Sequence, residues 1–326
     1  MNLSLYDKDL KRISIIGAQY ISCLWSEGYN TIENFTLELF ATDEYKKKVK
    51  TDCYVGRDDR KTLMVLKTVK VENGKIVASG KQAGRVLDDV SFIGTIESGS
   101  MIDTSIKKAY NSSNKYHNLE FADTDLQIPY KHQIGNKSFL ELCTTMCQSQ
   151  DVGFRTVRES GYIVTEFYQP KSNPNLVFSE RFGNLSINSI SISTENSKNY
   201  AIVLGEGEGD KRTKVFVDLT NGEHRLDLIV DARDIQREEN ETDESYNARL
   251  EARGIEKLLQ KRETFSCAFA PYAKDFGVKY DLGDILTVYL SDYGITLKAR
   301  VSRFTQKSQN NKTKTTIEVG QITVKR

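Results

Sequence analysis

Three glycines that alternate with acidic residues, at 205–209, interrupt a strand-like stretch at 200–234. Apolar residues precede the glycines and an alternating apolar pattern follows them at 215–219, so we expect strands on both sides. Residues 221–222 are Asn-Gly, a strong signal for a two-residue hairpin turn, because both positions must adopt positive φ. The stretch is therefore predicted to form a strand, an acidic glycine loop, a strand, a tight turn and a return strand at 226–230.

Phosphate binding does not fit this loop. Phosphate loops space their glycines as G-x-x-x-x-G-K-[ST] or G-x-G-x-x-G before a helix, whereas these glycines are two apart and strand pattern follows them. Calcium is better matched, since Glu206, Glu208 and Asp210 offer carboxylates, but the spacing of an EF-hand loop is absent. Alternating glycines are typical of a bulged connection where backbones approach closely. We expect that structural role, with no metal and no cofactor.

Length and charge limit the class of protein. A chain of 326 residues is long enough for two or more domains. With 46 basic and 45 acidic residues, the net charge of +1 gives no argument for nucleic acid or for an anionic membrane, so no nucleic-acid specificity is expected. The N-terminus lacks the apolar region of a secretory signal, and no apolar run approaches the ~20 residues that span a membrane.

The five cysteines are an odd number, and no C-x-x-C pair occurs among them. We interpret them as reduced core residues of a protein made in a cytoplasm. Cys143 and Cys147 are four residues apart on a predicted helix, where a disulfide would have poor geometry. If the protein acts outside the cell, it leaves by lysis or inside a particle.

Residues 1–95 have the pattern of antiparallel β structure. Residues 34–40 alternate cleanly, which places Phe35, Leu37 and Leu39 on one face. Asn-Gly at 73–74 marks a hairpin. Six or so short strands at this spacing predict a small barrel or sandwich.

Residues 96–178 change to a small α+β unit. Ser100 with Asp103, and Ser138 with Glu141, have the pattern of capping boxes at the start of two helices. Strands are expected at 153–155 and 162–168.

Residues 179–326 return to β structure, with a helix near 243–262 that begins after the capping residue Thr242. The predicted fold class is α+β, mainly β. Two β-rich regions, 1–95 and 179–326, flank the α+β unit at 96–178, which favours two barrels.

Enzyme motifs are absent from the sequence, including G-x-S-x-G and H-E-x-x-H. The best carboxylate cluster is Asp227, Asp231 and Asp234, with Arg225 and Arg233 between them. We favour an ion-paired strand end over a catalytic site, and we do not expect an enzyme. A cell-wall hydrolase or peptidase that uses these aspartates or the acidic loop stays open as an alternative.

Several short sequence motifs, each called a box, follow one another along nearly the whole chain. In chain order they are Cys23-Leu24-Trp25, the box from Val177 to Leu185, the box from Val203 to Gly209, the box from Val230 to Asp234, Arg253-Gly254, and the box from Tyr280 to Asp284. In this order they resemble the siphovirus-type phage tail protein family, which forms tail-associated and baseplate-hub proteins of tailed phages and phage-tail-like bacteriocins. The family-motif and interface candidates are Trp25, Phe178, Asn184, Gly205, Glu206, Gly207, Glu208, Gly209, Arg212, Asp231, Arg233, Asp234, Gly283 and Asp284.

The resemblance implies a structural baseplate or tail-tip hub. Such hubs carry two tail-tube-like β-barrel domains per chain, and three chains form a ring with pseudo-sixfold symmetry. The implied partners are two further copies, the tail tube protein, distal tail or baseplate proteins, and a spike, fibre or tape-measure protein. The protein would reside in the virion tail, after synthesis in the bacterial cytoplasm and release by lysis. A carbohydrate receptor-binding module is the other alternative.

Many relatives carry a long C-terminal extension, whereas this sequence ends at Arg326, soon after its last predicted strand. A fibre, spike or hydrolase is therefore expected to be a separate protein. The sequence leaves open whether the particle is a phage or a bacteriocin, and whether its tail is a contractile injection system.

Overall fold

The computed structural model describes residues 1–113, 116–193, 195–238, 241–261, 264–271, 273–310 and 312–325. It divides into two compact units. The main unit comprises residues 1–186 and 269–326, and the inserted unit comprises residues 187–268. These units group the chain differently from the three segments 1–95, 96–178 and 179–326, and that division stays a prediction.

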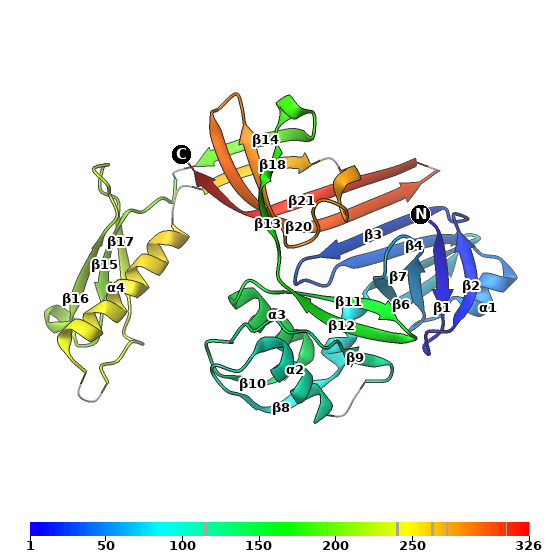
Figure 1. The fold of residues 1–326 in the computed structure, drawn as a ribbon, viewed down its shortest axis with the longest axis horizontal. Helices are drawn as coiled ribbons and strands as arrows, with labels where there is room; N and C mark the ends of the chain where they lie inside the picture. Colours follow the sequence, from blue (N-terminus) through cyan, green and yellow to red (C-terminus); the bar gives the residue numbers. More distant parts are fainter. Residues whose placement is uncertain are drawn as a thin grey trace. The chain divides into compact units, whose positions relative to one another are not determined.

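An eleven-stranded sheet dominates the described part of the main unit (Figure 1). Its strands are β1 (Leu3–Tyr6), β2 (Arg12–Gly17), β3 (Ser22–Gly28), β4 (Asn34–Phe40), β5 (Tyr54–Arg57), β6 (Leu63–Glu72), β7 (Lys75–Gln82), β13 (Ser172–Phe178), β19 (Ile285–Leu290), β20 (Ile295–Gln309) and β21 (Lys312–Lys325). The order is β13-β19-β20-β3-β4-β7-β6-β5-β1-β2, and β21 pairs with β20.

The long strand β20 joins the two β-rich regions of the chain. Its first part, Ile295 to Arg300, pairs with β19, whereas Arg303 to Gln309 pairs with β3. The regions predicted as two barrels therefore share one sheet. The strands of the described residues do not close into a barrel, since the order ends at β2 and β13. The mainly-β α+β class is confirmed, while the two barrels stay a prediction.

Local patterns in the first β region are confirmed. Phe35, Leu37 and Leu39 on β4 are fully buried, while Phe40 is 64% exposed. Asn73 and Gly74 have φ of 48° and 72° and connect β6 to β7 as a tight turn. The polar segment after β4 forms the short helix α1 (Asp43–Lys48), which Thr42 caps.

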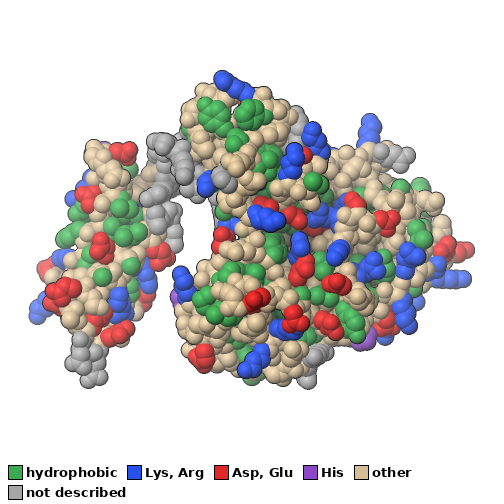
Figure 2. All heavy atoms as spheres, viewed as in Figure 1, with side chains coloured by type: hydrophobic (Ala, Val, Ile, Leu, Met, Phe, Trp, Pro, Cys, Tyr) green, Lys and Arg blue, Asp and Glu red, His purple; other side chains and the backbone are tan. Residues whose placement is uncertain are grey.

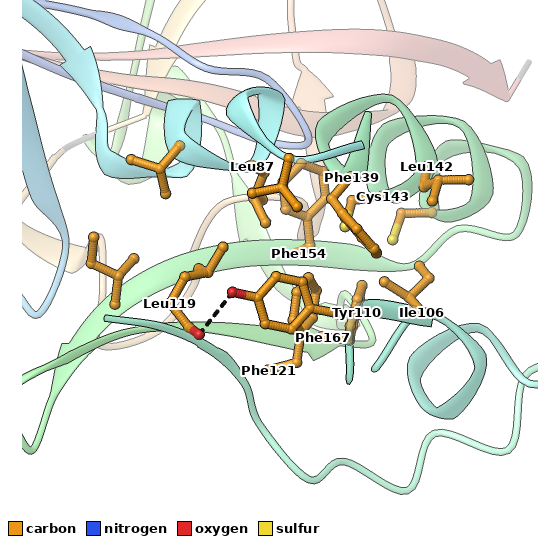
Figure 3. Close-up of a cluster of buried hydrophobic side chains, with 14 of the residues drawn as sticks. Leu87, Ile106, Tyr110, Leu119, Phe121, Phe139, Leu142, Cys143, Phe154 and Phe167 are labelled. Atoms are coloured by element: carbon orange, nitrogen blue, oxygen red, sulfur yellow. Dashed lines mark hydrogen bonds between the residues drawn. The ribbon is translucent and has the colours of Figure 1, made fainter. Parts of the chain in front are cut away.

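Helices and short strands form a second layer in the main unit. They are the 3-10 helix η1 (Ala83–Asp89), β8 (Ser91–Ile96), α2 (Ile102–Asn111), β9 (Leu119–Phe121), β10 (Ile134–Ser138), α3 (Phe139–Ser149), β11 (Gly153–Glu159) and β12 (Tyr162–Tyr168). Aromatic side chains fill the core (Figure 3). The rings of Tyr110 and Phe139 lie 5.3 Å apart edge to face, and the Tyr110 hydroxyl donates a hydrogen bond to the carbonyl of Leu119.

One of the two predicted capping boxes is confirmed. Ser138 and Glu141 form a reciprocal capping box at the start of α3. The prediction for Ser100 and Asp103 is wrong, because α2 begins after Met101 without a side-chain cap. Asp103 is buried, and it accepts hydrogen bonds from the Thr124 hydroxyl and the backbone N–H of Leu126. Its carboxylate therefore holds a following loop and does not cap the helix.

The inserted unit contains a three-stranded sheet with one helix (Figure 1), and most of the strands β14 (Leu185–Ser193) and β18 (Thr264–Pro271) also falls within its bounds. It contains β15 (Tyr200–Leu204), η3 (Gly209–Lys211), β16 (Lys214–Asp218), β17 (Asp227–Asp231) and α4 (Asp243–Gln260). The Thr242 side chain caps α4, as predicted, and the stripe of Tyr246, Leu250 and Leu258 is buried against the sheet.

The predicted pairing of the return strand with β16 is wrong. β15 lies between the other two strands, antiparallel to β16 and parallel to β17. Asn221 and Gly222 adopt positive φ of 49° and 88°, as predicted. After this turn, however, the chain runs past the end of β15 and pairs with its other edge as β17. Asn199 anchors it, since its carbonyl accepts from Leu219 N–H and its side-chain oxygen accepts from Leu226 N–H at 2.7 Å.

The remaining described elements are η2 (Glu180–Phe182), η4 (Ala273–Asp275) and a two-stranded sheet of β14 (Leu185–Ser193) and β18 (Thr264–Pro271). The sequence predicts an alternation of Leu185, Ile187, Ile190 and Ile192 along β14, which stays a prediction because the side chains at 188–193 lie outside the described ones. The cysteines with described side chains, Cys23, Cys53, Cys143 and Cys147, are buried free thiols. A helix long and apolar enough to cross a membrane is not found in the described ranges.

Candidate functional site

Two of the sequence boxes, the first at 177–185 and the second at 280–284, meet in the main unit. Phe178, at the end of β13, is fully buried, and its ring lies 5.4 Å from that of Tyr280, edge to face. β13 pairs in parallel with β19, which follows the second box directly. Asn184 holds the turn after β13, since its amide donates to the Val177 carbonyl at 3.0 Å and its oxygen accepts from Ser179 N–H at 2.8 Å.

Gly283 and Asp284 shape the approach to β19. Gly283 has a φ of +86°, and a Cβ there would lie 2.5 Å from the ring of Tyr29, so only glycine fits without strain. The Asp284 carboxylate accepts from the N–H groups of Lys171 and Asp281 at 2.7 and 2.9 Å. Both residues therefore hold backbone in place.

Trp25 belongs to a buried charged cluster. Its indole N–H donates to the carboxylate of Glu27 at 2.7 Å, and the Thr62 hydroxyl donates to the same oxygen at 2.9 Å. Arg60 completes the cluster, with its Nε 2.7 Å from Glu27. The side chain of Glu27 is 1% exposed and that of Arg60 is 18% exposed, so the carboxylate is held away from water while the guanidinium reaches the surface.

A hollow of about 310 Å³ in the main unit opens beside this cluster. Its walls carry charges of alternating sign, contributed by Glu27, Arg60, Asp281, Arg155 and Glu166. Each of these charged groups has an ionic partner within the wall. Asp59, which pairs with Arg57 at 2.6 Å, and Lys61 also line the hollow, so most of its charged groups are held in ion pairs.

The glycines of the acidic loop in the inserted unit permit close packing. A Cβ on Gly205 would lie 2.7 Å from the Tyr246 hydroxyl and 2.8 Å from Leu250 of α4. Gly207 has a φ of +105° and approaches the backbone of residues 211–212, and Gly209 has a φ of +53°. The loop is thus a tight backbone connection against the helix, as the glycine spacing predicts.

Arg212 holds this loop to the sheet. Its side chain is 7% exposed, and it donates to the Gly205 carbonyl at 2.8 Å, to the Leu204 carbonyl and to the Asp231 carboxylate at 2.6 Å. A buried guanidinium with three acceptors at the ends of two strands fastens the loop and β17 together.

Tyr246 fastens the loop to α4. Its hydroxyl accepts from the N–H of Glu206 and donates to the carbonyl of Ile235, both at 2.9 Å. The Glu206 carboxylate accepts from the N–H of Arg237 at 3.2 Å and lies 3.6 Å from the Arg237 guanidinium. Its ionic partner is therefore Arg237, whereas the sequence predicts local pairing with Lys211 or Arg212. Glu208 is exposed.

The three aspartates do not converge on one point; each pairs with its own arginine. Asp227 pairs with Arg225 at 2.6 Å, and Asp234 pairs with Arg253 at 2.9 Å. The Arg212 guanidinium lowers the pKa of Asp231, and the Arg253 guanidinium lowers the pKa of Asp234. Arg233 is exposed, with its Nε 3.7 Å from Asp231. The arrangement is an ion-paired strand end.

A metal site is not formed by the described side chains, since no group of three His, Cys, Asp or Glu residues is arranged to hold an ion.

Sequence reasoning missed the Glu27–Arg60 pair and the anchoring role of Tyr246. One signal could have found Glu27. It lies two residues after Trp25 on a strand and so faces the same side, and a charge on a buried face requires a buried partner.

A family model described as Siphovirus ReqiPepy6 Gp37-like protein matches residues 109–321. The chain belongs to this family. The predicted resemblance to siphovirus tail proteins is thus confirmed. The matched residues of this Gp37-like chain contain every interface candidate except Trp25. A search of curated proteins finds no match.

Solved structures of tail proteins share the fold over nearly their whole length. Prophage tail protein gp18 from Listeria monocytogenes EGD-e is 11% identical, with a TM-score of 0.62 over 98% of this chain and 94% of that one. The prophage MuSo2 43 kDa tail protein from Shewanella oneidensis is 12% identical, with a TM-score of 0.59 over 98% of each chain. A tail protein from Neisseria meningitidis MC58 is 12% identical, with a TM-score of 0.56 over 98% and 95%. The mainly-β α+β fold is therefore similar to that of phage tail proteins.

Proposed function

We propose that this protein is a non-enzymatic hub of a phage tail or phage-tail-like particle, which joins the tail tube to its tip, spike or fibre proteins. The observation that carries the proposal is the extent of the likeness. Family membership covers residues 109–321, and the fold is similar to tail proteins over 98% of this chain and 94–98% of theirs.

The proposed assembly is a closed homotrimer at the tube axis. β20 gives each chain two half-sheets, one on β19 and one on β3, and three chains would supply six such surfaces to a sixfold tube. The end strands β2 and β13 each pair on one side within the described sheet. Cyclic association with neighbouring copies would cover such edges and avoid open-ended growth.

The roles of the candidate residues also favour a structural protein. Trp25, Phe178, Gly205 and Arg212 are buried or packed against backbone. A general acid in a hydrolase needs a raised carboxyl pKa, whereas the neighbouring arginines lower the pKa of Asp231 and Asp234. The alternatives, a wall hydrolase or a carbohydrate receptor-binding module, receive no comparable support.

A comparison of two activities tests the proposal. The wild-type protein and the triple variant Asp227→Asn, Asp231→Asn, Asp234→Asn are each incubated with purified cell wall. Each protein is also tested for its ability to restore particle production when the gene is deleted. We expect no wall hydrolysis from either protein, and tails without tips when the gene is deleted. Wall hydrolysis by the wild-type protein that the triple variant lacks would overturn the proposal.

A further inference from the structure

The inserted unit has one covered and one open sheet face. On the covered face, Ala201, Val203 and Val230 are buried against α4. Side chains alternate along a strand, so Tyr200, Ile202 and Leu204 lie on the other face. Helix α4 covers only the first of these faces.

An apolar row crosses the open face. Ile202 is paired in register with Phe216 on β16 and with Ile229 on β17, so the three side chains lie side by side. Phe216 is 57% exposed and Ile229 is 69% exposed. Large apolar side chains that are this exposed and that lie next to one another on one sheet face are typical of a surface that another protein covers.

Charged rows border the apolar row on both sides. Tyr200 is flanked in register by Asp218 and Asp227, and Arg225 stacks on its ring at 3.6 Å. Leu204 is flanked by Lys214 and Asp231. Charged side chains of both signs therefore surround an apolar centre, and Asp227 and Asp231 are paired with arginines.

The two units differ in the sign of their charge. Residues 187–268 hold 17 Asp and Glu against 12 Lys and Arg, a net charge of −5, whereas the main unit holds 28 against 34, a net charge of +6. The net charge of +1 for the whole chain hides this difference. Basic and acidic side chains are interspersed on the visible face in Figure 2, so the difference is one of overall balance.

We propose that the open face, defined by Ile202, Phe216 and Ile229, docks on the main unit of a neighbouring copy of this chain. The neighbour's main unit has the opposite net charge, which favours this contact electrostatically. Two inserted units facing each other would instead bring together two units that each have a net charge of −5. This inference rests on the proposed homo-oligomer and names one of its contacts.

Photo-crosslinking from the open face tests this contact. The full chain carries p-benzoylphenylalanine in place of Phe216 and is assembled into particles from a mixture of light and heavy isotope-labelled copies. We expect crosslinks between differently labelled copies that end within residues 1–186 or 269–326. The matched control places the same group at Ile255, which is 37% exposed on α4 outside the open face, and should give few such crosslinks.

Every other crosslinking result overturns the inference. Crosslinks confined to one copy, crosslinks to residues 187–268 of another copy, crosslinks to a different tail protein, and a lack of crosslinks each do so. If the assembled particles contain the chain in three copies and one of these results is found, the docking inference fails while the hub function stands. If the chain is absent from the tail, the proposed function itself fails.

A double variant gives an independent measurement. Phe216→Ser with Ile229→Ser should weaken incorporation into tails at least about tenfold, the effect of losing a central interface side chain. Both side chains are exposed, so circular dichroism and protease resistance should match the wild-type protein. Ile255→Ser is the control and should incorporate normally. Equal incorporation of the double variant and the control would contradict the proposed contact.

Discussion

The main unit and the inserted unit hold their charged groups in different ways. In the main unit, Glu27 and Arg60 form an ion pair with a carboxylate that is 1% exposed. In the inserted unit, the Asp231 and Asp234 side chains are 60% and 62% exposed, although Arg212 beneath Asp231 is buried. Breaking a buried pair leaves an uncompensated charge, whereas exposed pairs contribute little. Loss of the Glu27 carboxylate should therefore cost much more stability than loss of the Asp234 carboxylate.

The two units also differ in how the side chains of their cores pack. The helical layer of the main unit contains interlocked aromatic rings, including Tyr110, Phe121 and Phe139. The inserted unit packs mainly small aliphatic side chains against one helix and leaves its other face open. Its loop depends on the hydrogen bonds of Arg212 and Tyr246. A small core makes specific polar anchors important for stability.

The largest effect is expected for Glu27→Gln. The change removes the carboxylate nearest to Arg60, whose side chain is 18% exposed and lies 3.9 Å from Asp281, so the free energy of unfolding of the main unit should fall by about 3 kcal/mol, the lower end for a buried pair. Trp25 is the only tryptophan and lies in the main unit, so its fluorescence in a urea titration reports that unit. Asp89→Asn removes a more exposed pair with Arg85 and should cost less than about 1 kcal/mol. Equal losses for both variants would remove the proposed contrast.

Tyr246→Phe should destabilise only the inserted unit. The Glu206 N–H and the Ile235 carbonyl would lose their partner, at a cost of about 1–3 kcal/mol. Hydrogen exchange of residues 200–231 should accelerate, while the Trp25 transition stays unchanged. Tyr293→Phe, at a 58% exposed position of the main unit, is the control. A shift of the Trp25 transition in Tyr246→Phe would mean that the units unfold together.

Gly254→Ala tests how tightly the helix packs on the sheet. A Cβ there would lie 2.7 Å from methyl groups of Val203 and Val217. Overpacking costs about 1–3 kcal/mol, which should exceed the gain of up to about 1 kcal/mol from better helix propensity. Gly320→Ala is the control, because the nearest atom to its added Cβ is 3.8 Å away. Increased stability of Gly254→Ala in thermal unfolding would contradict this packing.

The smallest effect is a pH dependence of the inserted unit. Because Arg212 lowers the pKa of Asp231, the stability from this pair is fully present above the unfolded value of about 3.9 and is lost as pH falls through the folded pKa. Urea unfolding followed by circular dichroism between pH 5 and pH 2 should show a smaller acid loss in Asp231→Asn than in the wild-type protein. Identical acid profiles would show that the pair contributes nothing.

Local features of the fold were predictable from the sequence. The alternation of Phe35, Leu37 and Leu39, the Asn73-Gly74 turn and the Ser138 capping box each depend on residues within a few positions of one another. The capping prediction at Ser100 failed because Asp103 found partners more than 20 residues away, in the loop of Thr124 and Leu126. Tertiary contacts overrode the local pattern there.

Strand pairing could not be predicted. The Asn221-Gly222 turn formed, yet its chemistry does not determine which strand the returning chain joins, and β17 joined β15. The pairing of β20 with β3 links residues about 280 positions apart, so no local pattern reports it. For the candidate site, the tight glycine loop was predicted, but the partners of Arg212 and Glu206 depend on that same strand order.

The most direct test of the hub function is a reconstruction of the intact tail tip at a resolution that identifies this chain. We predict three copies in a closed ring on the tube axis, with the half-sheets on β19 and on β3 presenting six similar surfaces to the tail tube. Six copies, a single copy, or a position away from the tube axis would contradict this account.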